Sequence, residues 1–259
     1  MICTAHPIES LRGIKGEYKV VHLIRHAQGQ FMSVGIPSLV FSNTFFTLKL
    51  FLIPIGTHNL AILNLGGIDG GPEEEYKNWK WYDARLTPLG EEQSRNLRPY
   101  IAAFKLEVVI TSPLSRTIQT GLHAIPSGVP FVVEDDCRER IGVHPCDKRR
   151  SKTELAADFP SINLDLLLSE EDDKWTDIRE PFEDLKARCE RFLEKLRLRP
   201  ETHIAVVTHN DFLTSLLYES DLRLADQKLQ KKFLNADSMP IVLTWSSKNT
   251  SENGAGAEA

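Results

Sequence analysis

Cysteine is scarce in this sequence, with four residues among 259 (Cys3, Cys137, Cys146 and Cys189). That number excludes a scaffold built on disulfides at this chain length and favours a reducing compartment. An excess of positive charge is also lacking, because 31 lysines and arginines face 36 aspartates and glutamates, for a net charge of −5. A protein that holds nucleic acid through its overall charge is therefore not expected.

An apolar leader is missing as well. The first 19 residues include Glu9 and Glu17, and they have neither the apolar run nor the cleavage site of a secretory signal. We expect a protein of the cytoplasm, or of cytoplasm and nucleus. With 41% hydrophobic and 26% charged residues, the chain has the composition of an ordinary globular protein of one large or two small domains.

Short apolar segments rich in β-branched residues alternate with helical patterns along the chain. Nearly continuous apolar runs are typical of parallel strands that are buried on both faces. Threonine or serine followed by proline predicts two helix starts, and apolar residues spaced by three and four predict a longer helix. The order of elements predicts an α/β sandwich of three layers, a mostly parallel sheet with helices on both faces. The predicted strands are Val20–Ile24, Glu107–Thr111, Phe131–Val133, His203–Thr208 and Met239–Trp245, and the helices start at Pro88 and near Pro113, span Pro181–Leu198, and follow His209.

Basic residues and histidines stand where three of these strands end. Arg25 and His26 follow the first strand, Arg116 falls in the first helical turn after the second, and His209 follows a third. Taken alone, an Arg-His pair is more typical of a surface loop. Because ligand sites in open α/β sheets lie at the carboxyl ends of strands, the combination indicates a pocket for a single phosphoryl group.

Four motifs follow one another along the chain. They are Arg25-His26-Ala27, Ser112 to Thr120, Cys137 to Gly142, and His209. In this order they resemble the histidine phosphatase superfamily, also called phosphoglycerate mutase-like, and the match runs from about residue 19 to 245. The family's Arg-His-Gly signature has alanine in the third position here, and the forms R-H-A-Q-G and G-V-H-P-C-D-K-R-R resemble a plant and fungal branch.

The resemblance implies a phosphoglycerate mutase-like fold and a role for each site residue. His26 is the nucleophile that becomes a phosphohistidine, while Arg25, Arg116 and His209 hold the phosphoryl oxygens. Glu139 is the general acid and base. Neither metal nor cofactor is needed, because two guanidinium groups neutralise the phosphate. The implied activity is a metal-independent phosphomonoesterase that acts on a small phosphorylated metabolite.

One segment, Phe31–Thr57, interrupts the first motif. It holds five of the twelve phenylalanines, has no acid, and carries one charge, Lys49. Its length suits a membrane span, but prolines and a polar run interrupt it, and no membrane partner is expected. If these 27 residues are an insertion, as from a retained intron, then Asn59 falls at the position of the asparagine that contacts the phosphate in the family.

Several alternatives remain open at this stage. The chain is a phosphatase, a phosphoglycerate mutase-type phosphotransferase, or an isoform impaired by the insertion. The basic run from Lys148 to Arg150 is as much a solvated helix start as a substrate clamp, and zinc at Cys137 and Cys146 is disfavoured by spacing. Substrate and oligomeric state are not specified. We expect an N-terminal extension (1–18), a catalytic domain (19–245) and a disordered tail (246–259).

Overall fold

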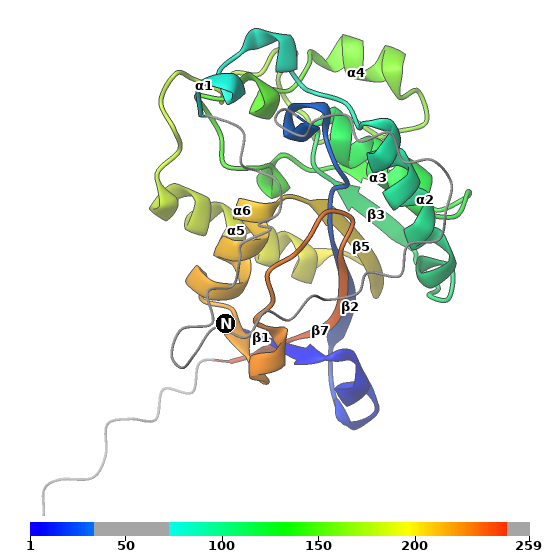
Figure 1. The fold of residues 1–259 in the computed structure, drawn as a ribbon. Coiled ribbons are helices and arrows are strands. Elements are labelled where there is room, and N and C mark those ends of the chain that lie inside the picture. The colour runs from blue at the N-terminus through cyan, green and yellow to red at the C-terminus, as the bar shows by residue number, and fades with distance from the viewer. Residues whose placement is uncertain (34–72, 248–259) are drawn as a thin grey trace, which may run out of the picture.

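The computed structural model describes residues 1–33 and 73–247 (Figure 1). Within them, seven strands form one sheet in the order β4-β3-β5-β2-β7-β1-β6. All neighbouring strands are parallel except at β7, which runs antiparallel to both β2 and β1. The strands are β1 (Ile2–Pro7), β2 (Tyr18–Arg25), β3 (Val108–Thr111), β4 (Phe131–Val133), β5 (His203–Thr208), β6 (Arg223–Leu224) and β7 (Ser238–Ser246).

Helices cover both faces of this sheet, which confirms the predicted three-layer α/β sandwich. In Figure 1, α2 and α3 lie on one side of the strands and α5 and α6 on the other. The helices are α1 (Glu73–Tyr76), α2 (Pro88–Ile101), α3 (Ser115–Ala124), α4 (Lys152–Asp158), α5 (Phe182–Leu198) and α6 (Asn210–Thr214), the last continuing into a π-helical turn (Ser215–Glu219). Short 3-10 turns span Ile8–Gly13, Gln30–Ser33, Trp79–Trp81, Asp135–Cys137, Pro145–Asp147 and Gln227–Leu229.

The two faces of the strands explain why their sequences are apolar without a break. In β3, Ile110 packs in one core cluster with Phe192 of α5, while Val109 packs in another with Ile118 of α3. Successive side chains of a strand point to opposite faces of the sheet. A strand in a sheet with helices on both faces therefore needs apolar residues at successive positions. The two cores hold the strand ends in fixed positions.

The N-terminal residues differ from the extension expected over 1–18. Strand β1 pairs with β7 along its whole length, from Ile2 opposite Ser246 to Pro7 opposite Ile241, and it also pairs with β6. Its alternate residues, including Cys3 and Ala5, are buried in the core. This part of the expected extension therefore belongs to the central sheet. Of the expected tail, residues 248–259 lie outside the described residues.

The start of α2 is joined to the loop that follows β2. Thr87 caps the helix by accepting a hydrogen bond from the Gly90 amide at 2.9 Å, and its own hydroxyl donates to Gln28 Oε1 at 2.9 Å. A Cβ atom at position 90 would lie 2.2 Å from the carbonyl oxygen of Gln28, so only glycine permits this approach. The loop that carries His26 is thereby fixed against a helix N-terminus.

His22, in the middle of β2, is a buried histidine with an apolar neighbour. Its ring lies 4.0 Å from that of Phe104, and neither ring nitrogen has a hydrogen-bond partner among the described residues. Burial, and next the charge of His203, lowers its pKa to about 4. The ring is therefore neutral in the folded protein.

Replacing His22 with leucine should stabilise the protein most at acidic pH. Because the folded pKa lies below the unfolded value, His22 costs stability as the pH falls from 6.5 to about 4, by roughly 3 kcal/mol at most. Chemical unfolding of both proteins between pH 7 and 4.5 measures this difference. A gap between the two unfolding free energies that stays constant over this range would contradict the assignment.

Candidate active site

His26 stands at the carboxyl end of β2 with a defined tautomer. Its Nδ1 lies 2.7 Å from the carbonyl oxygen of Ala27, and because a carbonyl can only accept, Nδ1 carries the proton. Nε2 therefore carries the lone pair. Burial, then the charges of Arg116 and Arg25, hold the pKa of His26 well below its usual range. The side chain is thus a neutral imidazole.

Arg116 directs its guanidinium at both histidines from the first turn of α3. Its Nε donates to Nε2 of His26 at 3.3 Å, and its Nη2 lies 3.2 Å from Nδ1 of His209. The opposite edge is fixed by the chain around residue 146, because Nη1 donates to the Cys146 carbonyl at 2.5 Å and Nη2 to Asp147 at 2.9 Å. The edge that faces the histidines is the one on which phosphoryl oxygens can bind in pairs.

His209, which follows β5, completes this group. Because Arg116 is the donor in their contact, Nδ1 of His209 accepts, and Nε2 donates to Ser112 Oγ at 2.8 Å. Burial, followed by the charges of Arg116 and His26, places the pKa of His209 well below its usual value. The ring centroids of His26 and His209 are 5.0 Å apart. Two neutral imidazoles thus flank one guanidinium.

Arg25 precedes the nucleophile and is almost completely buried. Its Nη1 donates to the carbonyl oxygen of Phe233 at 2.8 Å. Its charge contributes to the lowered pKa of His26. A second guanidinium charge therefore acts on the His26 ring.

Glu139 carries its proton at neutral pH. Its Oε1 accepts the amides of Arg140 at 3.0 Å and Asp211 at 3.1 Å. Burial, and then the negative charges of Asp211 and Asp147, raise the pKa of Glu139 to about 8. A carboxyl that is protonated at pH 7 can donate a proton to a leaving group.

The neighbouring acids Glu134 and Asp136 have other contacts. Lys195 of α5 lies 2.7 Å from a carboxylate oxygen of each. Asp136 also pairs with Arg191 at 3.3 Å. These two carboxylates are therefore paired with basic side chains of α5.

Arg188 positions the segment that carries Glu139, a function that sequence analysis misses. The buried Arg188 donates to the carbonyl oxygens of Asp136 and Arg138, each at 2.8 Å, and of Glu139 at 3.0 Å. Arg188 falls three residues after Leu185 on the apolar side of α5, and an arginine at a buried helical position is the signal that could have identified it.

Asp147 and Arg179 also join the site without having been predicted. The buried Asp147 carboxylate contacts Arg116 at 2.9 Å through Oδ1 and Arg179 at 2.8 Å through Oδ2. Burial opposes ionisation, but the hydrogen bond with His144 and then the charges of Arg179 and Arg116 hold the pKa of Asp147 well below its usual range. Asp147 is therefore ionised beside the anion site.

The sequence model of the histidine phosphatase superfamily (branch 1) matches residues 73–237. The chain belongs to this superfamily. The match includes Arg116, Glu139 and His209, whereas His26 precedes it. Membership indicates phosphoryl chemistry of the phosphatase or phosphomutase kind.

Two curated plant proteins illustrate the relationship. Phosphoglycerate mutase-like protein of Arabidopsis thaliana is 34% identical over 77% of this chain and 73% of its own length. Phosphoglycerate mutase-like protein 1 of the same plant is 33% identical over 75% and 69%. A mycobacterial glucosyl-3-phosphoglycerate phosphatase is similar with 17% identity, 86% and 92% coverage and a TM-score of 0.44.

The segment that interrupts the first motif begins inside this histidine phosphatase site. Phe31, counted in the sequence as the first inserted residue, is buried, with its ring 5.1 Å from the Arg116 guanidinium and 6.5 Å from the His26 ring. Phe31 thus forms part of the site wall. Residues 34–57 and Asn59 lie outside the described residues. In the described ranges, no helix is long and apolar enough to span a membrane.

The basic run that begins at Lys148 is mainly structural. Arg149 is buried and donates to the three carbonyl oxygens of residues 169–171. The Lys148 ammonium lies 5.5 Å from the ring of Trp79 and 5.0 Å from that of Trp175. The run therefore holds the loop between α4 and α5 in place.

Neither a metal cluster nor a reactive thiol stands out in the parts of the chain that the structure describes. No group of three or more histidine, cysteine or acidic side chains there is suited to a metal ion. Burial raises the pKa of Cys137 and of Cys146 well above the ordinary value. Both are protonated core thiols.

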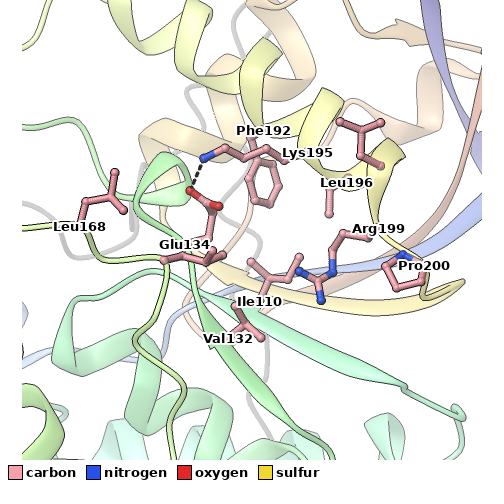
Figure 2. Close-up of a pocket in the computed structure, with 11 residues that line it drawn as sticks. Ile110, Val132, Glu134, Leu168, Phe192, Lys195, Leu196, Arg199 and Pro200 are labelled. Atoms are coloured by element: carbon pink, nitrogen blue, oxygen red, sulfur yellow. Dashed lines mark hydrogen bonds and ion pairs between the residues drawn. The ribbon is translucent and has the colours of Figure 1, made fainter.

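A cavity of about 480 Å³ lies between the end of α5 and the sheet (Figure 2). None of the predicted site residues lines it, and its one acid, Glu134, is paired with Lys195. The phosphoryl chemistry is therefore not assigned to this cavity. Its lining is Ile110, Val132, Glu134, Leu166, Leu168, Phe192, Lys195, Leu196, Leu198, Arg199 and Pro200.

Proposed function

We propose that this chain is a metal-independent phosphomonoesterase that hydrolyses a small phosphorylated metabolite through a phosphohistidine at His26. The observation that carries the proposal is the tautomer of His26. Nδ1–H is bound to the Ala27 carbonyl at 2.7 Å, so the lone pair of Nε2 points to the Arg116 edge at 3.3 Å. A phosphoryl group on that edge meets the nucleophile directly.

In the first half of the reaction, Nε2 of His26 attacks phosphorus and the bond to the leaving oxygen breaks. Arg116 exchanges its contacts with the two histidines for contacts with phosphoryl oxygens, which gain charge as the bond breaks. The protonated Glu139 gives its proton to the leaving oxygen, so that a neutral alcohol departs.

In the second half, water attacks the phosphohistidine. Glu139, now a carboxylate, takes a proton from the water while the bond between Nε2 and phosphorus breaks. Inorganic phosphate leaves and both side chains return to their starting states. The charges of Arg25 and Arg116 supply the stabilisation that a metal ion supplies in other phosphatases, which is why we propose chemistry without a metal.

A phosphomutase is the second candidate, because the curated plant relatives are named phosphoglycerate mutase-like. Its first half-reaction is the same. In the second half the phosphoryl group passes to a substrate hydroxyl and not to water. The two activities therefore differ only in the acceptor.

Labelling with a substrate carrying radioactive phosphate tests the proposal. With a chelator present, we expect continued release of inorganic phosphate and, after a rapid quench, protein-bound label that is stable to base and labile to acid. Label transferred mainly to a second substrate alcohol would instead establish the mutase. Turnover that stops with the chelator and returns with a divalent metal would overturn the metal-independent mechanism.

A further inference from the structure

The carboxylate of Asp147 joins two arginines from opposite sides of the site. Oδ1 accepts from Arg116 Nη2 at 2.9 Å, and Oδ2 accepts from Arg179 Nη1 at 2.8 Å. Asp147 is 4% exposed, so both contacts are shielded from water. The carboxylate has one oxygen for each guanidinium and holds the two groups at a fixed separation.

Arg179 is anchored on one side only. Its Nη1 also donates to the carbonyl oxygen of Gly142 at 2.7 Å. Gly142 has a φ of +89°, and a Cβ atom there would lie 2.1 Å from the Ile178 carbonyl, so the two chain segments are pressed together around this contact. The Nε and Nη2 groups make no hydrogen bond with the described residues, and Nη2 lies 4.0 Å from a carboxylate oxygen of Asp211. One edge of the guanidinium is therefore available to a ligand.

We propose that Arg179 is a further phosphate-binding residue and that Asp147 is a positioning residue that sets Arg116 and Arg179 as one anion clamp. The inference rests on the proposed phosphatase function. Arg116 presents its histidine-facing edge to one pair of phosphoryl oxygens, and Arg179 presents Nε and Nη2 to the outer oxygen or to the leaving group beside Glu139. The two guanidiniums and the carboxylate sum to one positive charge, which suits an anion.

The effect of Asp147→Asn on anion binding distinguishes a positioning role for Asp147 from a role as a simple counter-charge. If Asp147 is only a counter-charge, replacing it with the uncharged asparagine makes the site more positive and tightens anion binding. If Asp147 positions the arginines, the same replacement weakens binding, because both guanidiniums lose the group that aligns them. The two roles predict opposite results for one variant.

The experiment measures binding of vanadate and inorganic phosphate to Asp147→Asn, Arg179→Gln and the double variant, by calorimetry and by inhibition of nitrophenyl phosphate hydrolysis. We expect each single variant to bind about tenfold more weakly, the scale of one lost charge-assisted contact. The double variant should bind no more weakly than the singles, because the two residues act as one unit. Asp173→Asn removes an exposed carboxylate of the same loop and should leave binding unchanged.

Tighter binding by Asp147→Asn, or losses that add in the double variant, would overturn the proposal. Calorimetry with phosphate measures binding without turnover. If the protein binds phosphate but hydrolyses no ester, the proposed function is refuted, and the binding of the variants can still be compared. Melting curves identify a variant that fails to fold. In that event the test uses Arg179→Lys and Arg179→Gln, because position 179 is partly exposed. Both variants should bind vanadate more weakly: glutamine lacks the charge, and lysine keeps the charge but lacks the paired N–H donors of a guanidinium.

Discussion

Alanine at position 26 should abolish phosphate ester hydrolysis while leaving the protein folded. In the proposed mechanism the Nε2 lone pair of His26 attacks the phosphorus of the substrate, and without it no phosphohistidine forms for water to hydrolyse. Removing a covalent nucleophile typically costs roughly 10⁴-fold or more in kcat. Steady-state turnover of nitrophenyl phosphate and the acid-labile label on the protein should disappear together in His26→Ala.

The His22→Leu variant is the matched control, since it changes a histidine of the same strand that faces a core. It should retain both turnover and label. Circular dichroism and melting temperature establish that His26→Ala is folded. Near-normal turnover by His26→Ala would remove it as nucleophile, and loss of turnover with retained label would place the label elsewhere.

Glutamine at position 139 should slow hydrolysis of alkyl phosphates far more than that of nitrophenyl phosphate. An alkoxide needs a proton as it leaves, whereas nitrophenolate does not. The loss for a sugar or glycerol phosphate should be about 10²–10⁴-fold, as for a general acid, and much smaller for the aryl ester. Values of kcat/KM for both substrates in wild type and Glu139→Gln give the comparison.

The pH dependence supplies a second signature of Glu139. The protonated form is the active one and its pKa is raised to about 8, so kcat/KM for alkyl phosphates should hold near neutrality and fall as the pH rises through that value. The fall should be absent in Glu139→Gln. Glu134→Gln, which removes a carboxylate already paired with Lys195, should keep the wild-type profile. In the comparison of the two esters, equal losses of kcat/KM in Glu139→Gln would point to Asp136 or Glu134 as the acid.

Most of the candidate site residues that sequence could predict stand at the ends of regular elements, whereas Glu139 is predicted from its motif. Arg25 and His26 stand at the end of a strand that a continuous apolar run predicts. Arg116 follows a serine and a proline that predict a helix start. The alanine that replaces the family's glycine after His26 makes contacts that only the structure shows. Ala27 acts through its backbone, with its carbonyl on His26 and its amide on Thr120 at 3.1 Å.

The site residues that sequence could not predict lie in segments outside the long helices and strands. Asp147 and Arg179 are far apart in sequence and lie in loops without periodicity, so no pattern pairs them. Strand β1 was missed because only its alternate residues are buried and Pro7 ends it, which gives a weak strand signal. Its place in the sheet comes from β7, at the other end of the chain.

That long-range pairing bears on how the protein is made. Strand β2 ends at Arg25, whereas its two neighbours in the sheet begin at His203 and Ser238. A ribosome must therefore release most of the chain before either flank of the nucleophile's strand is covered, and such distant pairings fold slowly and leave apolar segments exposed meanwhile. The last turn before β7 also contacts the nucleophile's backbone, because the Ala236 amide donates to the His26 carbonyl at 3.2 Å. A chain that ends just short of Ser238 would thus keep every predicted catalytic side chain, yet it would lack the strand that covers one flank of β2.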